Sequence, residues 1–205
     1  GIIPAPEANH AVRGAIDGVA PEGEPGREGQ PPGTRGLGSG PFGLVLPGLL
    51  IAFLVARTAA PVRDQDTFWH VVSGRDLLEG GSLSGPDPLS DLTTDPWIKH
   101  AWLPDLVFAL ADRVGGPRAV ALLLPVMTAV VLVTLYVALR RRGGNVLLSC
   151  VLLAIAFLGM AGSLSARPQV LSFAFTAVVG ALWLRAEETS RPPWAVVPLT
   201  WLWAS

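Results

Sequence analysis

Charged residues are scarce in this sequence, and neither sign predominates. Only 15% of the 205 residues are charged, and 15 Lys and Arg against 16 Asp and Glu give a formal net charge of −1. The basic residues are scattered apart from one cluster, so nothing indicates the positive field that attracts nucleic acid. We therefore set nucleic-acid binding aside.

Cysteine is rare, and residues 1–42 do not show the pattern of a cleavable leader. Cys150 is the single cysteine, so the chain forms neither an internal disulfide nor a cysteine-based zinc site. We interpret Cys150 as a small core residue of an apolar run. Residues 1–42 contain neither the short apolar core nor the small-residue cleavage site of a secretory signal. The first long apolar run is therefore predicted to be a membrane anchor that stays in the protein.

Apolar residues are abundant. They make up 50% of the sequence, and the mean hydropathy is +0.47, a balance too apolar for an ordinary soluble domain. A helical run of about 19 residues rises about 28 Å, close to the hydrocarbon thickness of a bilayer. We predict an all-α polytopic bundle of transmembrane helices. Its spans are expected at about 43–60, 119–139, 146–163 and 170–184, with the start of a fifth at Trp194.

The first 42 residues have a different composition, rich in Gly, Pro, Glu and Arg. Such a segment cannot bury enough apolar surface to offset the entropy of ordering, so we predict a disordered tail. The chain begins with Gly1 and not with Met, and it ends at residues 201–205 inside an apolar segment. These two features predict an N-terminal fragment of a longer protein.

Basic residues in short loops predict the orientation, because Lys and Arg are retained on the cytoplasmic side. The arginine triplet at 140–142 predicts an inner turn, and Arg185 and Arg191 predict the next one. Six further basic residues lie in or beside the long segment 61–117, where the rule carries less weight. We predict a multi-pass plasma-membrane protein with a cytoplasmic N-terminus and with residues 61–117 and 164–169 on the outer side.

The outer loop at 61–117 is too long for a simple connector, and loops of this size are usually functional. Its pattern predicts two amphipathic helices. The first covers residues 68–79, with Asp66 or Thr67 as its N-cap, and the second covers about 102–114. Each is followed by a Gly-Gly pair that ends it. Two such helices with tryptophans are typical of a pair lying at the membrane interface.

Several motifs of this loop, and one in a later turn, resemble those of bacterial polytopic proteins related to the class C glycosyltransferases. In that family the first outer loop carries an Asp-x-Asp or similar acidic motif and continues as interfacial helices. The resemblance covers about residues 43–205. The motifs are DQDTFWH at 64–70, Gly74, Gly80-Gly81, PDPLS at 86–90, WIKHAWL at 97–103 and ARPQ at 166–169.

The resemblance implies an inverting glycosyltransferase that takes a sugar from a polyprenyl phosphate carrier at the outer leaflet. Carried onto this sequence, Asp64 or Asp66 is the general base that accepts the proton of the acceptor hydroxyl, or else a ligand of a divalent cation. The leaving phosphate calls for cations and hydrogen-bond donors. The substrate-binding candidates are His70, Lys99, His100, Arg167 and Gln169.

Several of these residues have a structural alternative. Asp66 stands where a helix N-cap belongs, and its i, i+4 spacing from His70 also allows an acid–imidazole hydrogen bond. His100 either contacts the substrate or is a residue at the start of a helix that forms a hydrogen bond to the loop backbone. Arg167 either reaches the site or extends to lipid headgroups.

The function also has an alternative. Relatives place an acid where Ala101 stands, and the nearest acid is Asp105, so a second carboxylate role stays open. The spacing of the loop histidines and aspartates matches no dense metal motif, so the sequence identifies no metal or other cofactor. Trp69, Trp97 and Trp102 are interpreted as interface anchors in preference to platforms for a sugar ring. The alternative is a non-catalytic polytopic membrane protein, whether a transporter, a lipid-binding protein or a scaffold.

Overall fold

The structure is a computed structural model that describes residues 42–86 and 96–204. About 75% of it is helical, which confirms the predicted helical class, and its strands form one short antiparallel pair that the sequence did not predict. The tail predicted at 1–42 lies, apart from Phe42, outside the described residues. The elements are α1 (Phe42–Ala56), α2 (Gln65–Leu78), β1 (Ser84–Gly85), β2 (Trp97–Ile98), α3 (Trp102–Arg141), α4 (Val146–Ala161), α5 (Gln169–Thr189) and α6 (Val196–Ala204).

Two glycines break α3 where the sequence predicts a break. Gly115 and Gly116 have non-helical backbone angles, and the positive φ of 64° at Gly116 favours glycine because a Cβ atom would be strained there. Pro117 follows, and its fixed φ suits the first turn of a helix. The predicted loop helix at 102–114 and the predicted span at 119–139 are thus the two parts of α3.

The helices differ in their ability to cross a membrane. Two of them, α3 and α5, are long and apolar enough to do so. The shorter α1 and α4 have 15 and 16 residues, so they rise only about 22 and 24 Å. The first predicted span ends early, at Ala56, since the Thr58 hydroxyl and amide both donate to the Val55 carbonyl in a terminal turn.

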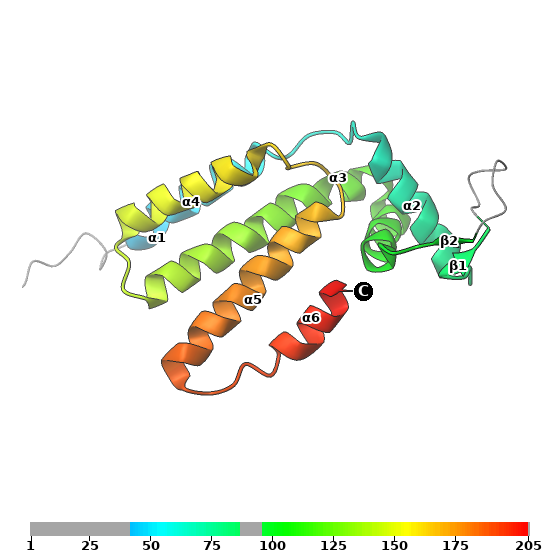
Figure 1. Cartoon of the computed structure of the whole chain (residues 1–205). Coiled ribbons are helices and arrows are strands. Elements are labelled where there is room, and N and C mark those ends of the chain that lie inside the picture. The colour runs from blue at the N-terminus through cyan, green and yellow to red at the C-terminus, as the bar shows by residue number, and fades with distance from the viewer. Residues whose placement is uncertain (1–41, 87–95, 205) are drawn as a thin grey trace, which may run out of the picture. The chain divides into compact units, whose positions relative to one another are not determined.

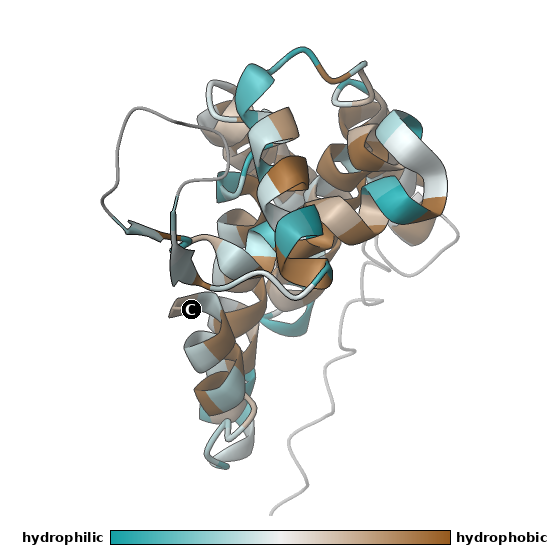
Figure 2. Ribbon diagram, turned by 90° about the vertical axis from the view of Figure 1, so that its right-hand side faces the viewer, coloured by the Kyte–Doolittle hydropathy of each residue, from teal (hydrophilic) through white to brown (hydrophobic). Residues whose placement is uncertain are grey.

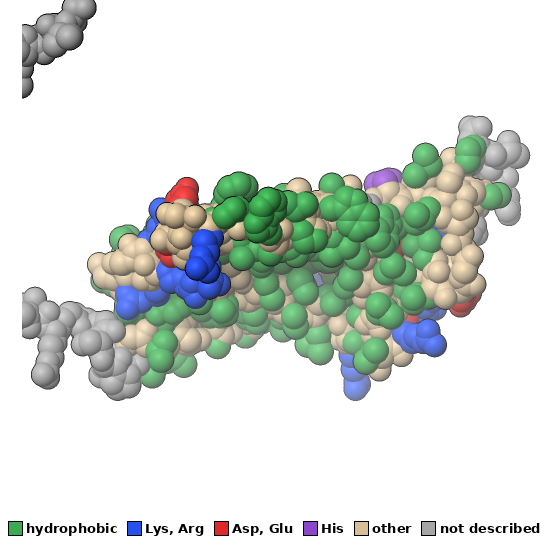
Figure 3. All heavy atoms as spheres, turned by 90° about the horizontal axis from the view of Figure 1, so that it is seen from below, with side chains coloured by type: hydrophobic (Ala, Val, Ile, Leu, Met, Phe, Trp, Pro, Cys, Tyr) green, Lys and Arg blue, Asp and Glu red, His purple; other side chains and the backbone are tan. Residues whose placement is uncertain are grey.

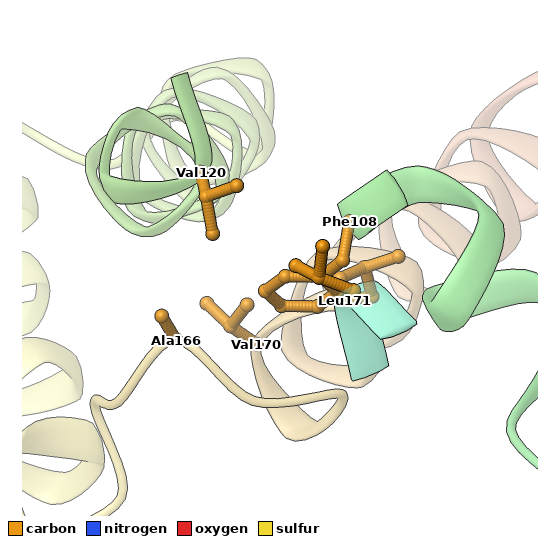
Figure 4. Packing of buried hydrophobic residues seen from close by; sticks show 6 residues of the cluster. Phe108, Val120, Ala166, Val170 and Leu171 are labelled. Carbon is orange, nitrogen blue, oxygen red and sulfur yellow. The ribbon is translucent and has the colours of Figure 1, made fainter. Parts of the chain in front are cut away.

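Helix α3 is central to the arrangement, and α1, α2, α4 and α5 all contact it (Figure 1). A buried cluster joins α2, both parts of α3 and the start of α5 (Figure 4). A second cluster joins Leu54, Leu132 and Leu153 of α1, α3 and α4. The first cluster matters for function because it brings the start of α2 against the turn before α5. Its members are Val71, Phe108, Val120, Ala166, Val170 and Leu171.

Much of the helical surface is apolar. Val114, Leu44 and Leu158 are 86%, 75% and 71% exposed, and the brown, apolar stretches of the helices can be followed in Figure 2. Figure 3 shows one face where green apolar side chains form a broad expanse with charged side chains on either side of it. Apolar patches of this kind mark surfaces that contact protein or lipid. Together with the two long apolar helices, this surface fits a membrane location.

Candidate functional site

Arg167 links two parts of the chain that lie 103 residues apart in the sequence. Its Nε and Nη2 atoms donate to the two carboxylate oxygens of Asp64, with 3.0 Å from Nη2 to Oδ1. Its Nη2 atom also lies 3.1 Å from Oδ2 of Asp66. The paired geometry suits a planar guanidinium and fixes its orientation. Arg167 therefore faces the two predicted aspartates.

Asp64 is placed by the helix that it caps. Its backbone is extended and its Oδ1 accepts a hydrogen bond of 3.1 Å from the amide of Asp66, so α2 begins at Gln65. The predicted N-cap, Asp66 or Thr67, is therefore wrong, and the helix starts three residues before the predicted position 68. The Thr67 hydroxyl is used elsewhere: it is buried and donates a 2.6 Å hydrogen bond to the carbonyl of Ala166. This bond holds α2 to the same turn that carries Arg167.

The two aspartates differ in their surroundings. Hydrogen bonds from Arg167, with the amide of Asp66, the Ser165 side chain and the guanidinium charge, hold the pKa of Asp64 below its ordinary value despite partial burial. The same pairing raises the pKa of Arg167. Asp64 is thereby stabilised in its ionised form and is a weak proton acceptor. The Asp66 side chain is 59% exposed and reaches Arg167 at a single contact, which leaves it accessible to a ligand.

A polar cleft of about 670 Å³ surrounds these residues. Residues 60–66 and 164–167 line it, with Ala121 and Leu124 of α3. A neighbouring apolar groove of about 610 Å³ shares part of this lining. The groove is lined by Ala59, Ala60, Pro61, Val62, Phe68, Pro117, Arg118, Ala121 and Leu122. The charged cleft and the apolar groove are therefore adjacent.

His70 pairs with Asp105, so the predicted hydrogen bond between His70 and Asp66 is wrong. Nδ1 of His70 lies 2.6 Å from Oδ1 of Asp105, and the Ser73 hydroxyl donates to Oδ2 at 2.7 Å. Asp105 is only 3% exposed, so its carboxylate is buried with both oxygens bonded. The carboxylate that pairs with His70 thus comes from α3, which packs against α2, while Asp66 faces Arg167.

Sequence reasoning named Asp105 only as the acid nearest to Ala101, and it did not consider Ser73. A signal for Asp105 exists in the spacing: it stands three and four residues before Phe108 and Ala109, which are fully buried. A carboxylate on the core-facing side of a helix needs polar partners. His70 and Ser73, three residues apart on one face of α2, provide them.

Other predicted site residues lie at the edge of this region. Lys99 is 8% exposed and its ammonium group donates to Asp76 and, at 2.8 Å, to the carbonyl of Ser82. Its charge therefore stabilises the connection between α2 and the β1–β2 pair. Nδ1 of His100 lies 3.2 Å from the carbonyl of Ile98, in agreement with its structural alternative. Gln169 begins α5 and lines neither the cleft nor the groove.

A third hollow, which we call the indole cavity, has a volume of about 300 Å³. The rings of Trp69 and Trp97 lie edge to face, with centroids 6.2 Å apart and an interplanar angle of 77°. Asp66 belongs to both the indole cavity and the cleft, so the two hollows meet at its side chain. The cavity is lined by Asp66, Trp69, His70, Ser73, Trp97, Lys99, His100, Ala101 and Asp105.

The described residues fit a divalent cation poorly. Within 42–86 and 96–204, no group of three or more His, Cys, Asp or Glu side chains is arranged to hold a metal ion. Both carboxylate oxygens of Asp64 already accept hydrogen bonds from Arg167, whose positive charge would oppose a cation. We therefore derive no chemical step through a metal.

Comparisons with protein-family models, with curated proteins and with solved structures found no match. Function is therefore inferred from the chemistry of the cleft, the groove and the indole cavity. The cleft shares Ala60, Pro61, Val62 and Ala121 with the groove, and it shares Asp66 with the indole cavity.

Proposed function

We propose that the protein is a polytopic membrane glycosyltransferase of the class C type, which transfers a sugar from a polyprenyl phosphate carrier to an acceptor at the outer face of the membrane. The observation that carries the proposal is the apolar groove beside a cleft containing Arg167. A lipid phosphate has the matching chemistry, since its hydrocarbon chain suits the groove and its anionic head suits the cleft.

The proposed topology follows the two ends of α5. The cleft lies at the start of this helix, and near its other end Glu187 pairs with Arg142 of the turn after α3. The 21 residues of α5 rise about 31 Å, close to the thickness of the bilayer hydrocarbon. We assign the cleft and residues 61–117 to the outer face, and the Arg142 end to the cytoplasmic face, with the apolar helices crossing between them.

Arg167 is the proposed phosphate ligand. Its Nε and Nη2 atoms are occupied by the aspartates, but the two N–H groups of Nη1 have no acceptor among the described residues. Asp64 therefore acts as a positioning residue that aims the free edge of the guanidinium. The exposed Arg63 also lines the cleft and has no acidic partner within 42–86 and 96–204. Two cations near the leaving phosphate would stabilise the charge that develops there.

Asp66 is the proposed general base. The acceptor oxygen forms a bond to the anomeric carbon as the bond from that carbon to the phosphate oxygen breaks. The phosphate leaves with the bonding electrons, and the proton of the acceptor hydroxyl passes to the Asp66 carboxylate. Asp66 suits this role better than Asp64 because it is more exposed and less firmly paired. Its place between the cleft and the indole cavity brings it near both substrates.

Carrier binding tests the proposal directly. Arg167→Ala should weaken the binding of undecaprenyl phosphate to the protein in nanodiscs by about tenfold or more, as expected for the loss of a charge-assisted contact of about 1.5–3 kcal/mol. Arg191→Ala is the matched control, because Arg191 is exposed and lies outside the cleft. Native mass spectrometry or a quantitative lipid-binding assay gives the affinities. Equal carrier binding by wild-type protein and Arg167→Ala would contradict the proposed site. Strong carrier binding without any sugar transfer by the wild-type protein would favour the non-catalytic, lipid-binding alternative.

A further inference from the structure

The indole cavity has the chemistry of a carbohydrate site. We propose that it is the acceptor subsite and that the acceptor is a saccharide, whose pyranose ring packs on Trp97 and Trp69 while one hydroxyl donates to Nε2 of His70. This inference rests on the proposed function, because it names the second substrate of the same reaction. It goes further by giving that substrate a chemical class and a place.

The hydrogen bonds of His70 determine what its ring presents to a ligand. An ionised carboxylate only accepts hydrogen bonds, so the contact of 2.6 Å with Asp105 places the hydrogen on Nδ1. In the neutral imidazole the opposite nitrogen, Nε2, is then an acceptor. No described residue bonds to Nε2, and the His70 side chain is 17% exposed where it lines the indole cavity. The cavity therefore offers an oriented acceptor for a hydroxyl group.

Asp105 and Ser73 hold the His70 ring in this orientation from the buried side of the ring. Asp105 is buried, and its second oxygen accepts the hydrogen bond of the Ser73 hydroxyl. Burying a carboxylate is costly unless its oxygens are paired. A membrane anchor made of tryptophans needs no buried acid of this kind. In this chain the acid fixes the imidazole ring that faces the indole cavity.

The two indoles provide the apolar side of the cavity. Trp69 and Trp97 are 38% and 40% exposed, so each retains free ring surface beside the edge-to-face contact. One face of a pyranose carries mainly C–H groups and packs on an aromatic ring, while its rim carries hydroxyl groups. Asp66, His70 and His100 supply polar groups around these rings. A volume of about 300 Å³ lies at the small end of ligand pockets and suits a single sugar ring.

The position of Asp66 joins this subsite to the proposed chemistry. Asp66 lines both the indole cavity and the cleft, so an acceptor hydroxyl that enters from the cavity meets the base before it reaches the anomeric carbon. Lys99 borders the same cavity, but Asp76 and the carbonyl of Ser82 hold its ammonium group. The cavity therefore favours a neutral, hydroxyl-rich ligand over an anion.

Binding of simple saccharides tests the subsite on the whole protein in nanodiscs. The probes are the methyl glycosides of glucose, galactose, mannose and N-acetylglucosamine, each titrated by saturation-transfer NMR. We expect saturable binding of at least one probe. Trp97→Ala should weaken it by about two- to tenfold, as expected for the loss of one aromatic contact, and Trp97→Phe should retain most of it. Trp194→Ala is the control, since Trp194 is 75% exposed and does not line the indole cavity.

A substitution of His70 separates ligand contact from structural support. His70→Asn keeps an N–H group that can donate to Asp105 but removes the Nε2 acceptor, so the fold should persist while saccharide binding falls. The proposal is overturned if no probe binds, or if bound probes are insensitive to both Trp97→Ala and His70→Asn. Undecaprenyl phosphate binding in the same variants should stay at the wild-type level. Absence of saccharide binding by the wild-type protein would therefore disprove the subsite, whereas carrier binding that is unchanged by Arg167→Ala would disprove the proposed function.

Discussion

At the scale of single residues, the two aspartates at the start of α2 have separate tasks. Asp64 caps the helix and orients Arg167, and its ionised form is needed for the ion pair with Arg167. Asp66 lies two residues further along, in the first turn of α2. It makes one contact with Arg167, and its carboxylate is exposed. The sequence motif Asp-x-Asp contains both, but it does not distinguish them. Their difference arises from the turn at 164–167, which approaches only in the folded protein.

The pH dependence of stability should reveal the role of Asp64. Its pKa in the folded protein is depressed, so its stabilising effect is fully present above the ordinary carboxyl pKa of about 3.9 and is lost as the pH falls through the folded value. Thermal unfolding of the wild-type protein and Asp64→Asn should therefore differ most near neutral pH. The difference should shrink below about pH 4. A constant difference down to pH 2 would show that the charge of Asp64 contributes nothing.

At the scale of elements, the helices are easier to predict from sequence than their contacts. The glycine pair at 115–116 predicts the break in α3, and Gly80, with φ of 93°, ends α2 as expected. These features are local, since they depend on backbone freedom at one position. The pairing of Asp105 with His70 depends instead on which face of α3 meets α2, and no local pattern fixes that choice. For the same reason the sequence allowed an Asp66–His70 bond that the structure does not form.

The backbones of α2 and α3 approach each other closely at Gly74. A Cβ atom at Gly74 would lie 2.0 Å from the backbone carbonyl oxygen of Asp105, and backbone cannot yield as a flexible side chain does. Gly74→Ala should therefore force the two helices apart, lower the free energy of unfolding by about 1–3 kcal/mol and weaken the His70–Asp105 contact. Thermal unfolding in detergent measures the effect. Gly159→Ala in α4 is the control, because a Cβ atom there meets nothing within 4 Å. Equal stability of the two variants would contradict the close packing of α2 on α3.

At the scale of the whole molecule, the proposal requires the cleft and the arginine-rich turn to face opposite sides of the membrane. Arg142 of that turn pairs with Glu187 and Glu188, but acidic residues contribute little to orientation. The basic triplet at 140–142 should therefore keep its turn in the cytoplasm. The apolar surface between the two ends then contacts lipid.

Cysteine labelling of intact cells tests this topology. In a Cys150→Ala background, a membrane-impermeant thiol reagent should label Ser84→Cys, which is exposed in β1, and should not label Thr189→Cys at the end of α5. Permeabilised cells provide the control, because both positions should then react. The opposite pattern in intact cells would place the cleft on the cytoplasmic side and contradict an outer-face reaction.

The transfer reaction itself tests the central claim most directly. Purified protein in nanodiscs would be supplied with polyprenyl phosphate carriers of radiolabelled hexoses and with a saccharide acceptor, and labelled product would be counted. We predict transfer by the wild-type protein. Asp66→Asn should reduce the rate at least about 100-fold while carrier binding is retained, because the variant loses its general base. Transfer at the wild-type rate by the double variant Asp64→Asn and Asp66→Asn would contradict the account.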